Sequence, residues 1–308
     1  PLPDGADAIV IQEDTTAVNE QINVMESAQS GADVRPAGLD FSVGDILLKT
    51  GAVLSARDLG LAAAMNVPWL RVRRRPRVAI VATGDEVMMP GDPIGADQIV
   101  SSNSIALAAI VRVLGGEPLG LGIARDTDAS LRQVLSGAKG ADVLVTIGGA
   151  SVGDYDLVQK VMAEDGLDLN FYKVAMRPGK PLIFGRWKDI PVLGLPGNPV
   201  SAGVTSAIFL RAAINVMLGI GDGGLGTEKA RLGCDVKANG MRQEFMRATL
   251  DTDSEGNLVT TPFDRQDSAM MASFASADCL VIRPVDAPSA QAGDIVEIVR
   301  FDKGLSRF

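Results

Sequence analysis

Residues 77–86 read Arg77-Val78-Ala79-Ile80-Val81-Ala82-Thr83-Gly84-Asp85-Glu86. The apolar run at 78–82 does not alternate with polar residues, which is typical of a strand buried on both faces of a parallel sheet. It ends in a turn with a hydroxyl, a glycine and carboxylates. Because ligands of open parallel sheets bind at the carboxyl ends of the strands, this turn is a candidate binding site.

The segments after this strand continue the alternation of strand and helix as far as residue 218. We expect helices at 104–114, 127–137, 156–164 and 199–218, and strands at 118–123, 142–147, 182–184 and 192–195. Strands separated by helices form right-handed crossover units. The sequence therefore predicts an α/β domain with a mostly parallel sheet and helices on both faces.

The segments before residue 77 and after residue 218 show different sequence patterns. We expect a strand at 6–13 and a helix at 56–65 that Ser55 caps. A glycine-rich linker at 221–226 is followed by strand-like runs without helical periodicity, at 229–236, 245–250, 258–261, 279–282 and 295–299. These runs predict a small β-sandwich or barrel. The expected domains are residues 1–70, 71–221 and 222–308.

Composition excludes several classes of protein. The chain has 308 residues and a formal net charge of −9, which disfavours binding to nucleic acid or anionic membranes. We find no apolar run of the roughly 20 residues that a membrane-spanning helix needs. Residues 1–5 lack the features of a signal peptide, so we expect a cytoplasmic protein with Cys234 and Cys279 reduced.

The absence of histidine limits the chemistry further. It excludes a histidine general base, a Ser-His-Asp triad and zinc sites that contain histidine. Any metal would be bound mainly by oxygen ligands. That preference favours magnesium.

Small residues with carboxylates or hydroxyls follow four of the expected strands, at 83–86, 125–128, 148–156 and 195–199. Glycines there let backbone N–H groups approach an anion, and the following helix adds a favourable partial charge. A structural turn is the alternative for each loop alone. Between these loops the basic turn at 173–181 suits a phosphate or another oxyanion, and a solvated surface turn is its alternative.

The string Gly148-Gly149-Ala150-Ser151-Val152-Gly153-Asp154-Tyr155-Asp156 resembles the molybdopterin-binding signature. It is accompanied, in the order of the MoeA and gephyrin E-domain family, by Pro3-Asp4-Gly5-Ala6-Asp7-Ala8, Thr83-Gly84-Asp85-Glu86, Pro178-Gly179-Lys180-Pro181 and Gly194-Leu195-Pro196-Gly197-Asn198-Pro199-Val200-Ser201. The resemblance implies a three-layer α/β/α molybdopterin-binding domain, a C-terminal β-barrel-like domain and an N-terminal linking region. It also implies that the N-terminal portion is incomplete.

Enzymes of this family insert molybdenum into adenylylated molybdopterin in a Mg²⁺-dependent step, with release of AMP and the molybdenum cofactor. The resemblance therefore implies a transferase, molybdopterin molybdenumtransferase, of molybdenum cofactor biosynthesis. Its substrates would be molybdate and adenylylated molybdopterin. It also implies a homodimer and contact with the molybdopterin adenylyltransferase, without nucleic-acid or membrane partners.

The resemblance also implies roles for individual residues. Asp85, Asp126 and Asp156 are candidate Mg²⁺ ligands, and Asp40 is a further acidic residue of the cleft. Lys173, Arg177 and Lys180 would hold the pterin phosphate or molybdate, although lysine is commoner where Arg177 stands. The other candidates for substrate binding are Thr83, Gly84, Glu86, Gly148, Gly149, Ser151, Gly153, Pro196, Gly197, Asn198, Arg247 and Ser268.

Simpler interpretations stay open for some of these residues. Asp85 and Asp126 are alternatively helix or turn caps, and Arg247 is alternatively a surface residue of a strand. Ser268 follows Asp267 where the family usually has glycine. For the whole chain, the alternatives are a molybdopterin adenylyltransferase or CinA-like enzyme with the same α/β domain, and a gephyrin-like scaffold.

Overall fold

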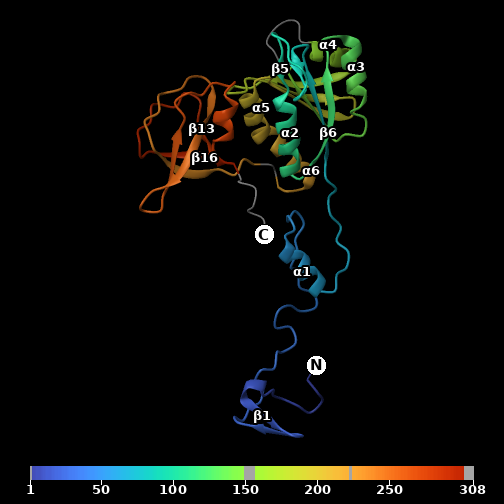
Figure 1. The fold of residues 1–308 in the computed structure, drawn as a ribbon, viewed down its shortest axis with the longest axis vertical. Coiled ribbons are helices and arrows are strands. Elements are labelled where there is room, and N and C mark those ends of the chain that lie inside the picture. The colour runs from blue at the N-terminus through green and yellow to red at the C-terminus, as the bar shows by residue number, and fades with distance from the viewer. Residues whose placement is uncertain (1, 149–156, 222–223, 302–308) are drawn as a thin grey trace. The chain divides into compact units, whose positions relative to one another are not determined.

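The computed structural model describes residues 2–148, 157–221 and 224–301 (Figure 1). The chain divides into two compact units, Pro1–Lys49 and Thr50–Phe308.

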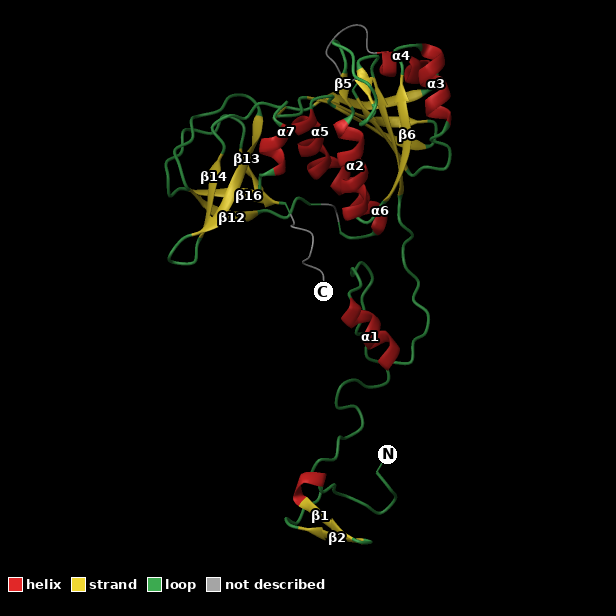
Figure 2. Cartoon of the chain, in the orientation of Figure 1, coloured by secondary structure: helices red, strands yellow, loops and turns green. Residues whose placement is uncertain are grey.

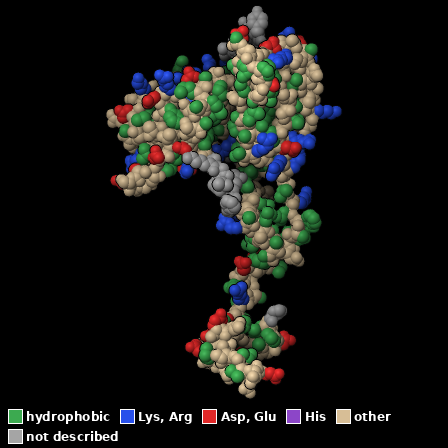
Figure 3. Space-filling model, in the orientation of Figure 1, with side chains coloured by type: hydrophobic (Ala, Val, Ile, Leu, Met, Phe, Trp, Pro, Cys, Tyr) green, Lys and Arg blue, Asp and Glu red, His purple; other side chains and the backbone are tan. Residues whose placement is uncertain are grey.

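In the first unit, a 3-10 helix, η1 (Gln12–Asp14), leads into a hairpin of β1 (Thr15–Val18) and β2 (Gln21–Val24). The two strands are antiparallel. The strand expected at 6–13 is wrong: among the described residues, Asp7 and Ile9 form backbone hydrogen bonds only with the turn at residues 31–32, and residues 12–14 belong to η1. Figure 3 shows acidic side chains on the surface of the unit.

The second unit begins with the expected short helix. Helix α1 spans Ala56–Ala64, and Ser55 and Asp58 form a capping box at its start. The Ser55 hydroxyl accepts from the Asp58 backbone, and the Asp58 carboxylate accepts from the Ser55 backbone at 2.7 Å. These bonds satisfy backbone donors that a helix start would otherwise leave unpaired.

A six-stranded sheet forms the centre of the α/β region, in the order β6-β3-β7-β11-β10-β8. Strands β6, β3, β7 and β11 are parallel to one another, whereas β10 runs antiparallel to both β11 and β8. The strands are β3 (Arg77–Thr83), β6 (Glu117–Ala124), β7 (Val143–Ile147), β8 (Leu167–Lys173), β10 (Pro181–Trp187) and β11 (Ile190–Leu195), with a separate short pair, β4 (Val87–Met88) and β5 (Ile99–Val100).

Helices cover both faces of this sheet (Figure 2). On one face, α2 (Ser102–Val113) packs through Leu107 and Val111 beside the long helix that ends at Leu218. On the other face lie α3 (Asp128–Ser136) and α4 (Leu157–Glu164). The sheet and its two helical layers confirm the expected three-layer α/β domain.

The long helix consists of α5 (Pro199–Thr205), a π-helical turn, η2 (Ser206–Leu210), and α6 (Arg211–Leu218). By length and mean hydropathy, 1.5, it could cross a membrane, which contradicts our reading that no apolar run is long enough. However, 56% of its most apolar 18-residue stretch is buried within the protein, and Leu210 and Ile214 pack against the sheet. The apolar composition is accounted for by this packing.

The C-terminal strands form a barrel. They are β12 (Glu228–Leu232), β13 (Gln243–Thr252), β14 (Leu258–Pro262), β15 (Cys279–Arg283) and β16 (Ile295–Arg300). The order β14-β12-β16-β15-β13 is closed by the pairing of β14 with β13. Because the sheet closes on itself, the domain is a barrel and not a sandwich. A short helix, α7 (Met271–Ala275), packs outside the barrel against α5.

The barrel is joined to the α/β region by a strand and by a shared core. Strand β9 (Met176–Arg177), which lies between β8 and β10 in the chain, pairs in parallel with β13. Met176 also belongs to a buried cluster in which Val200 and Val204 of α5 contact Phe245 and Leu280 of the barrel. The pairing and the cluster fix the barrel against the α/β region.

Candidate functional site

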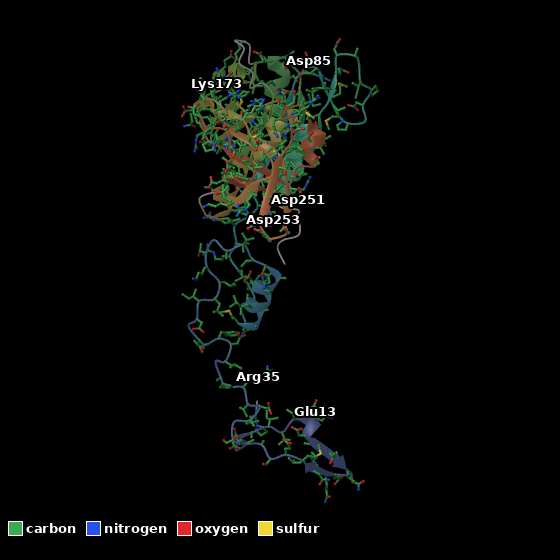
Figure 4. The ribbon with its side chains drawn as sticks, turned by 90° about the vertical axis from the view of Figure 1, so that its left-hand side faces the viewer. Glu13, Arg35, Asp85, Lys173, Asp251 and Asp253 are labelled. Atoms are coloured by element: carbon green, nitrogen blue, oxygen red, sulfur yellow. The ribbon has the colours of Figure 1, made fainter. Side chains whose placement is uncertain are left out.

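The strand ends predicted to form a site lie at one edge of the sheet. Thr83 is in register with Ala124, and Ile147 is in register with Leu195. Strand β8 ends at the same edge with Lys173, which pairs with Pro181 at the start of β10. Figure 4 shows Asp85 and Lys173 at the same end of this unit.

The turn after β3 is held by its neighbours. The Thr83 hydroxyl is buried and donates to the Ile147 carbonyl at 3.4 Å, so it stabilises the sheet. Gly84 has φ +132°, which favours glycine, and its N–H donates to the Ala124 carbonyl at 3.2 Å. The Glu86 carboxylate folds back against Gly84, so a Cβ atom there would require that side chain to move.

Asp85 and Asp126 are brought together by a direct hydrogen bond. The backbone N–H of Asp126 donates to the Asp85 carboxylate at 3.2 Å, and Arg125 donates to the Asp85 carbonyl at 3.0 Å. Both aspartates are exposed. Asp126 is not a helix cap, because Thr127 caps α3 by accepting from the Ser130 backbone at 3.2 Å.

This pair supplies two of the carboxylates that a Mg²⁺ site could use. Among the described residues there is no group of three or more Asp, Glu, Cys or His side chains placed to hold a metal. Mg²⁺, however, is commonly bound by one or two carboxylates together with water and substrate phosphates. Asp156, the third predicted ligand, lies outside the described residues, as do Gly149, Ser151 and Gly153.

Gly148 occupies a position that only glycine fits without strain. Its φ is +84°, its N–H donates to the Leu195 carbonyl at 3.1 Å, and a Cβ would come within 3.1 Å of the Thr83 hydroxyl. A Cβ on Gly197 would lie 3.8 Å from the Gly148 Cα. The loops after β7 and β11 are therefore in close contact at the sheet edge.

The turn before α5 holds Ser268 of the barrel region. Pro199 begins the helix, but the Asn198 side chain does not cap it and instead donates to the Ser268 hydroxyl at 2.9 Å. The Val200 N–H donates to the Ser268 carbonyl at 3.0 Å, and Asn103 donates to the Gly197 carbonyl at 2.6 Å. Pro196 is buried beneath this turn.

Arg247 lies in the interior of the protein. Its side chain is 1% exposed, so the alternative of a surface residue is wrong. It donates to the carbonyls of Arg265, Asp267 and Met270 at 2.9–3.2 Å, and its Nε donates to Gln266 at 3.4 Å. Burial lowers the pKa of this guanidinium. Arg247 therefore anchors the 265–270 loop, which carries Ser268.

The predicted cations do meet in one cavity, of about 850 Å³, between the α/β region and the barrel. Lys173, Arg177 and Lys180 line it from one side, and Arg242 and Glu244 line it from the barrel side. Sequence reasoning missed Arg242. The sequence does place Arg242 close to Gly240, in a turn immediately before a strand. A long basic side chain at that position can extend past the end of the strand.

The carboxylate pair and the cation cavity lie apart along the sheet edge. Asp85 follows β3 and Lys173 ends β8, and four strand spacings separate those strands, which is roughly 19 Å. The predicted residues thus share one edge without forming one compact pocket. Asp40 is exposed in the Pro1–Lys49 unit.

Comparison with known proteins places the whole chain in one family. Residues 1–66 match the MoeA N-terminal region (domain I and II), residues 79–215 the probable molybdopterin binding domain, and residues 229–301 the MoeA C-terminal region (domain IV). Molybdopterin molybdenumtransferase 2 of Mycobacterium tuberculosis is 34% identical over 97% of this chain and 74% of its own length. The chain belongs to the MoeA family.

Other members of the MoeA family agree with this assignment. Molybdopterin molybdenumtransferase of a Nostoc species is 38% identical over 226 residues, and the chain spans 52% of that relative's length. A crystal structure of the molybdopterin biosynthesis MoeA protein from Pyrococcus horikoshii superposes with a TM-score of 0.81 at 33% identity, covering 98% of this chain and 73% of that one. The barrel and the α/β region are therefore the family's own arrangement.

Proposed function

We propose that this chain is a molybdopterin molybdenumtransferase, which inserts molybdenum from molybdate into adenylylated molybdopterin and releases AMP. The observation that carries the proposal is the sheet edge with carboxylates at one end and a cation-lined cavity at the other. A substrate in which a pterin phosphate is joined to AMP is long enough to reach both. The relatives of the chain support the same activity.

The cavity suits molybdate, a tetrahedral dianion, because its cations come from both sides. Arg177 and Lys180 reach it from the α/β region and Arg242 reaches it from the barrel. Guanidinium and ammonium groups bind oxyanions through charge-assisted hydrogen bonds. In this proposal the sulfurs that receive the metal belong to the pterin, so Cys234 and Cys279 take no part.

The carboxylate pair suits the phosphoanhydride end of the substrate. Asp85 and Asp126 would hold Mg²⁺, which supplies Lewis-acid polarisation of the phosphate oxygens when bound. The N–H groups in the loops at Gly84 and Gly148 lie at the same edge and are already paired with strand carbonyls. These bonds fix the backbone at Gly84 and Gly148.

We also propose that the active form is a homodimer. Leu59, Val67, Trp69 and Leu70 of the α1 segment are 37–87% exposed, and α1 borders a groove of about 410 Å³. Burial of such an apolar surface by a second copy would be strongly favourable. Light scattering of the purified protein tests this proposal, because a monomer at micromolar concentration would refute it.

An activity assay separates the proposed function from its alternatives. The protein is incubated with adenylylated molybdopterin, molybdate and MgCl₂, and AMP release is measured. The same protein is then tested for ATP consumption with molybdopterin. AMP release that depends on molybdate supports the proposal, whereas ATP consumption would assign the chain to the adenylyltransferases. No AMP release in the first assay and no ATP consumption in the second, with dimerisation intact, would favour the scaffold.

A further inference from the structure

Glu244 is the one carboxylate among the described residues that line the cation cavity. Its side chain is 20% exposed, and its Oε1 lies 3.1 Å from Nη1 of Arg177. A fully deprotonated dianion in this cavity would be repelled by Glu244 and would compete with it for Arg177. A site built only for tight anion binding would not place a carboxylate there.

Sheet register explains why Glu244 and Arg177 meet. Glu244 of β13 is in register with Arg177 of β9 on one side and with Arg283 of β15 on the other. Residues opposite one another on neighbouring strands point to the same face of a sheet. Arg177, Glu244 and Arg283 therefore form a row across three strands whose backbones are about 5 Å apart, with Glu244 in the middle.

Arg283 has an unused donor. Its side chain is 6% exposed and donates through Nη2 to the Pro288 carbonyl, while its buried Nε has no partner within the described part of the chain. A buried donor without an acceptor is costly, and a neighbouring carboxylate is the strongest acceptor a protein can offer. Arg283 is thus an alternative partner for Glu244.

We propose that Glu244 is an exchangeable counter-ion that sets the affinity of the cavity for its anion. It pairs with Arg177 when the cavity holds no dianion. When a tetrahedral dianion binds, Arg177 turns to the ligand and Glu244 moves to the free Nε of Arg283. The exchange lowers the affinity for simple dianions, because each binding event must first break the pair of Glu244 with Arg177.

Isothermal titration of the full chain with sodium molybdate, and separately with sodium sulfate, tests this inference. Glu244→Gln removes the competing charge, and we expect about tenfold tighter binding of both anions. Glu228→Gln is the matched control, because Glu228 pairs with Arg300 on the barrel and does not line the cavity. It should leave both affinities unchanged. Unchanged or weaker binding by Glu244→Gln, or no heat with either protein, overturns the inference.

The role of Arg283 is tested by a double-mutant cycle. Arg283→Lys removes the Nε–H that would receive Glu244, and we expect several-fold weaker anion binding in the wild-type background and no effect in the Glu244→Gln background. An equal loss in both backgrounds would show that Arg283 does not act through Glu244. Thermal unfolding of each variant identifies any general loss of structure.

The choice of molybdate as ligand rests on the proposed function, but the sulfate measurement does not. If Glu244→Gln tightens the binding of both anions but the protein releases no AMP, the counter-ion role of Glu244 stands and the proposed enzyme activity is refuted. If the protein releases AMP but Glu244→Gln does not change anion binding, the enzyme activity stands and the counter-ion role is refuted.

Discussion

The backbone N–H of Asp126 donates to the Asp85 carboxylate across 3.2 Å, which joins the loops after two neighbouring strands, β6 and β3. An asparagine at position 85 could accept the same hydrogen bond, since its amide oxygen replaces a carboxylate oxygen. Only the negative charge would be lost. The charge and the geometry of this pair can therefore be tested separately.

We expect Asp85→Asn to lower the rate of AMP release by about 100-fold, because a neutral amide cannot help to hold Mg²⁺ on the substrate phosphates. The thermal midpoint should not change. Asp128→Asn is the control, because Asp128 lies in the first turn of α3 and faces Lys160 at 3.9 Å. Equal activity of wild type and Asp85→Asn would remove Asp85 from the site.

Arg242→Met should weaken the apparent affinity for molybdate about tenfold, because it removes a cation that faces the cavity. Steady-state AMP release at varied molybdate concentration measures this effect. Arg231→Met, on the exposed side of β12, should have none. If both variants behave like wild type, the barrel contributes no ligand to the oxyanion.

Arg247→Met should destabilise the protein by about 3 kcal/mol, because the carbonyls of the 265–270 loop would lose buried donors. Urea unfolding measures the loss, and Arg231→Met again serves as the exposed control. A stable Arg247→Met protein with impaired anion binding would instead place Arg247 at the ligand.

A matched pair of glycines separates backbone strain from close contact. Gly148 and Gly140 have φ angles of +84° and +83°, but a Cβ on Gly140 meets nothing within 4 Å, whereas one on Gly148 meets Thr83. Gly140→Ala should cost about 1 kcal/mol from strain alone. Gly148→Ala should cost at least about twice as much in the free energy of unfolding. Equal losses would show that the loop at 148 can move away from β3.

Asp142 predicts a pH dependence of stability. Hydrogen bonds from Arg74 at 2.5 and 2.6 Å, and a weaker contribution from the Arg77 backbone, lower the pKa of Asp142 against the opposing effect of burial. A lowered folded pKa gives stability that is present above the unfolded value, about 3.9, and is lost as the pH falls through the folded value.

Asp142→Asn should therefore be less stable than wild type at pH 7 by up to about 1 kcal/mol, since Arg74 is largely exposed. The difference should shrink below about pH 4. Urea unfolding from pH 3 to 7 measures it, with Asp168→Asn of the exposed edge strand as control. A difference that does not vary with pH would contradict the assignment.

The parts of the fold with buried, uninterrupted apolar runs were predictable from the sequence. Strand β3 and the capped helix α1 lie where the pattern indicates, because local sequence decides both. Strand β8 was missed, because as an edge strand it mixes Asp168 and Asn170 with exposed apolar residues and shows no buried run. The strand predicted at 6–13 does not form, although its pattern is apolar, because its backbone meets only a turn at 31–32 and no second strand in the described part of the chain.

The site was predictable only where it follows from strand ends. The shared edge of Thr83, Gly148 and Lys173 follows from sheet topology. The burial of Arg247 does not, because it depends on a loop 18 to 23 residues further along the chain closing over it. One feature of the sequence did indicate it: Arg247 lies two residues after the buried Phe245 in β13, so both side chains point to the same face of the strand. That face points away from the barrel core and toward α5.

The pairing of β9 with β13 bears on how this protein can be divided in the laboratory. A cut in the glycine-rich stretch near residue 222 would look safe from the sequence. It would nevertheless remove the strand at Met176–Arg177 and leave Gln243 and Glu244 of β13 without a neighbouring strand on that side. The α/β region expressed alone would expose Met176, Val200 and Val204 to water. Both halves of the anion cavity should therefore be produced in a single polypeptide.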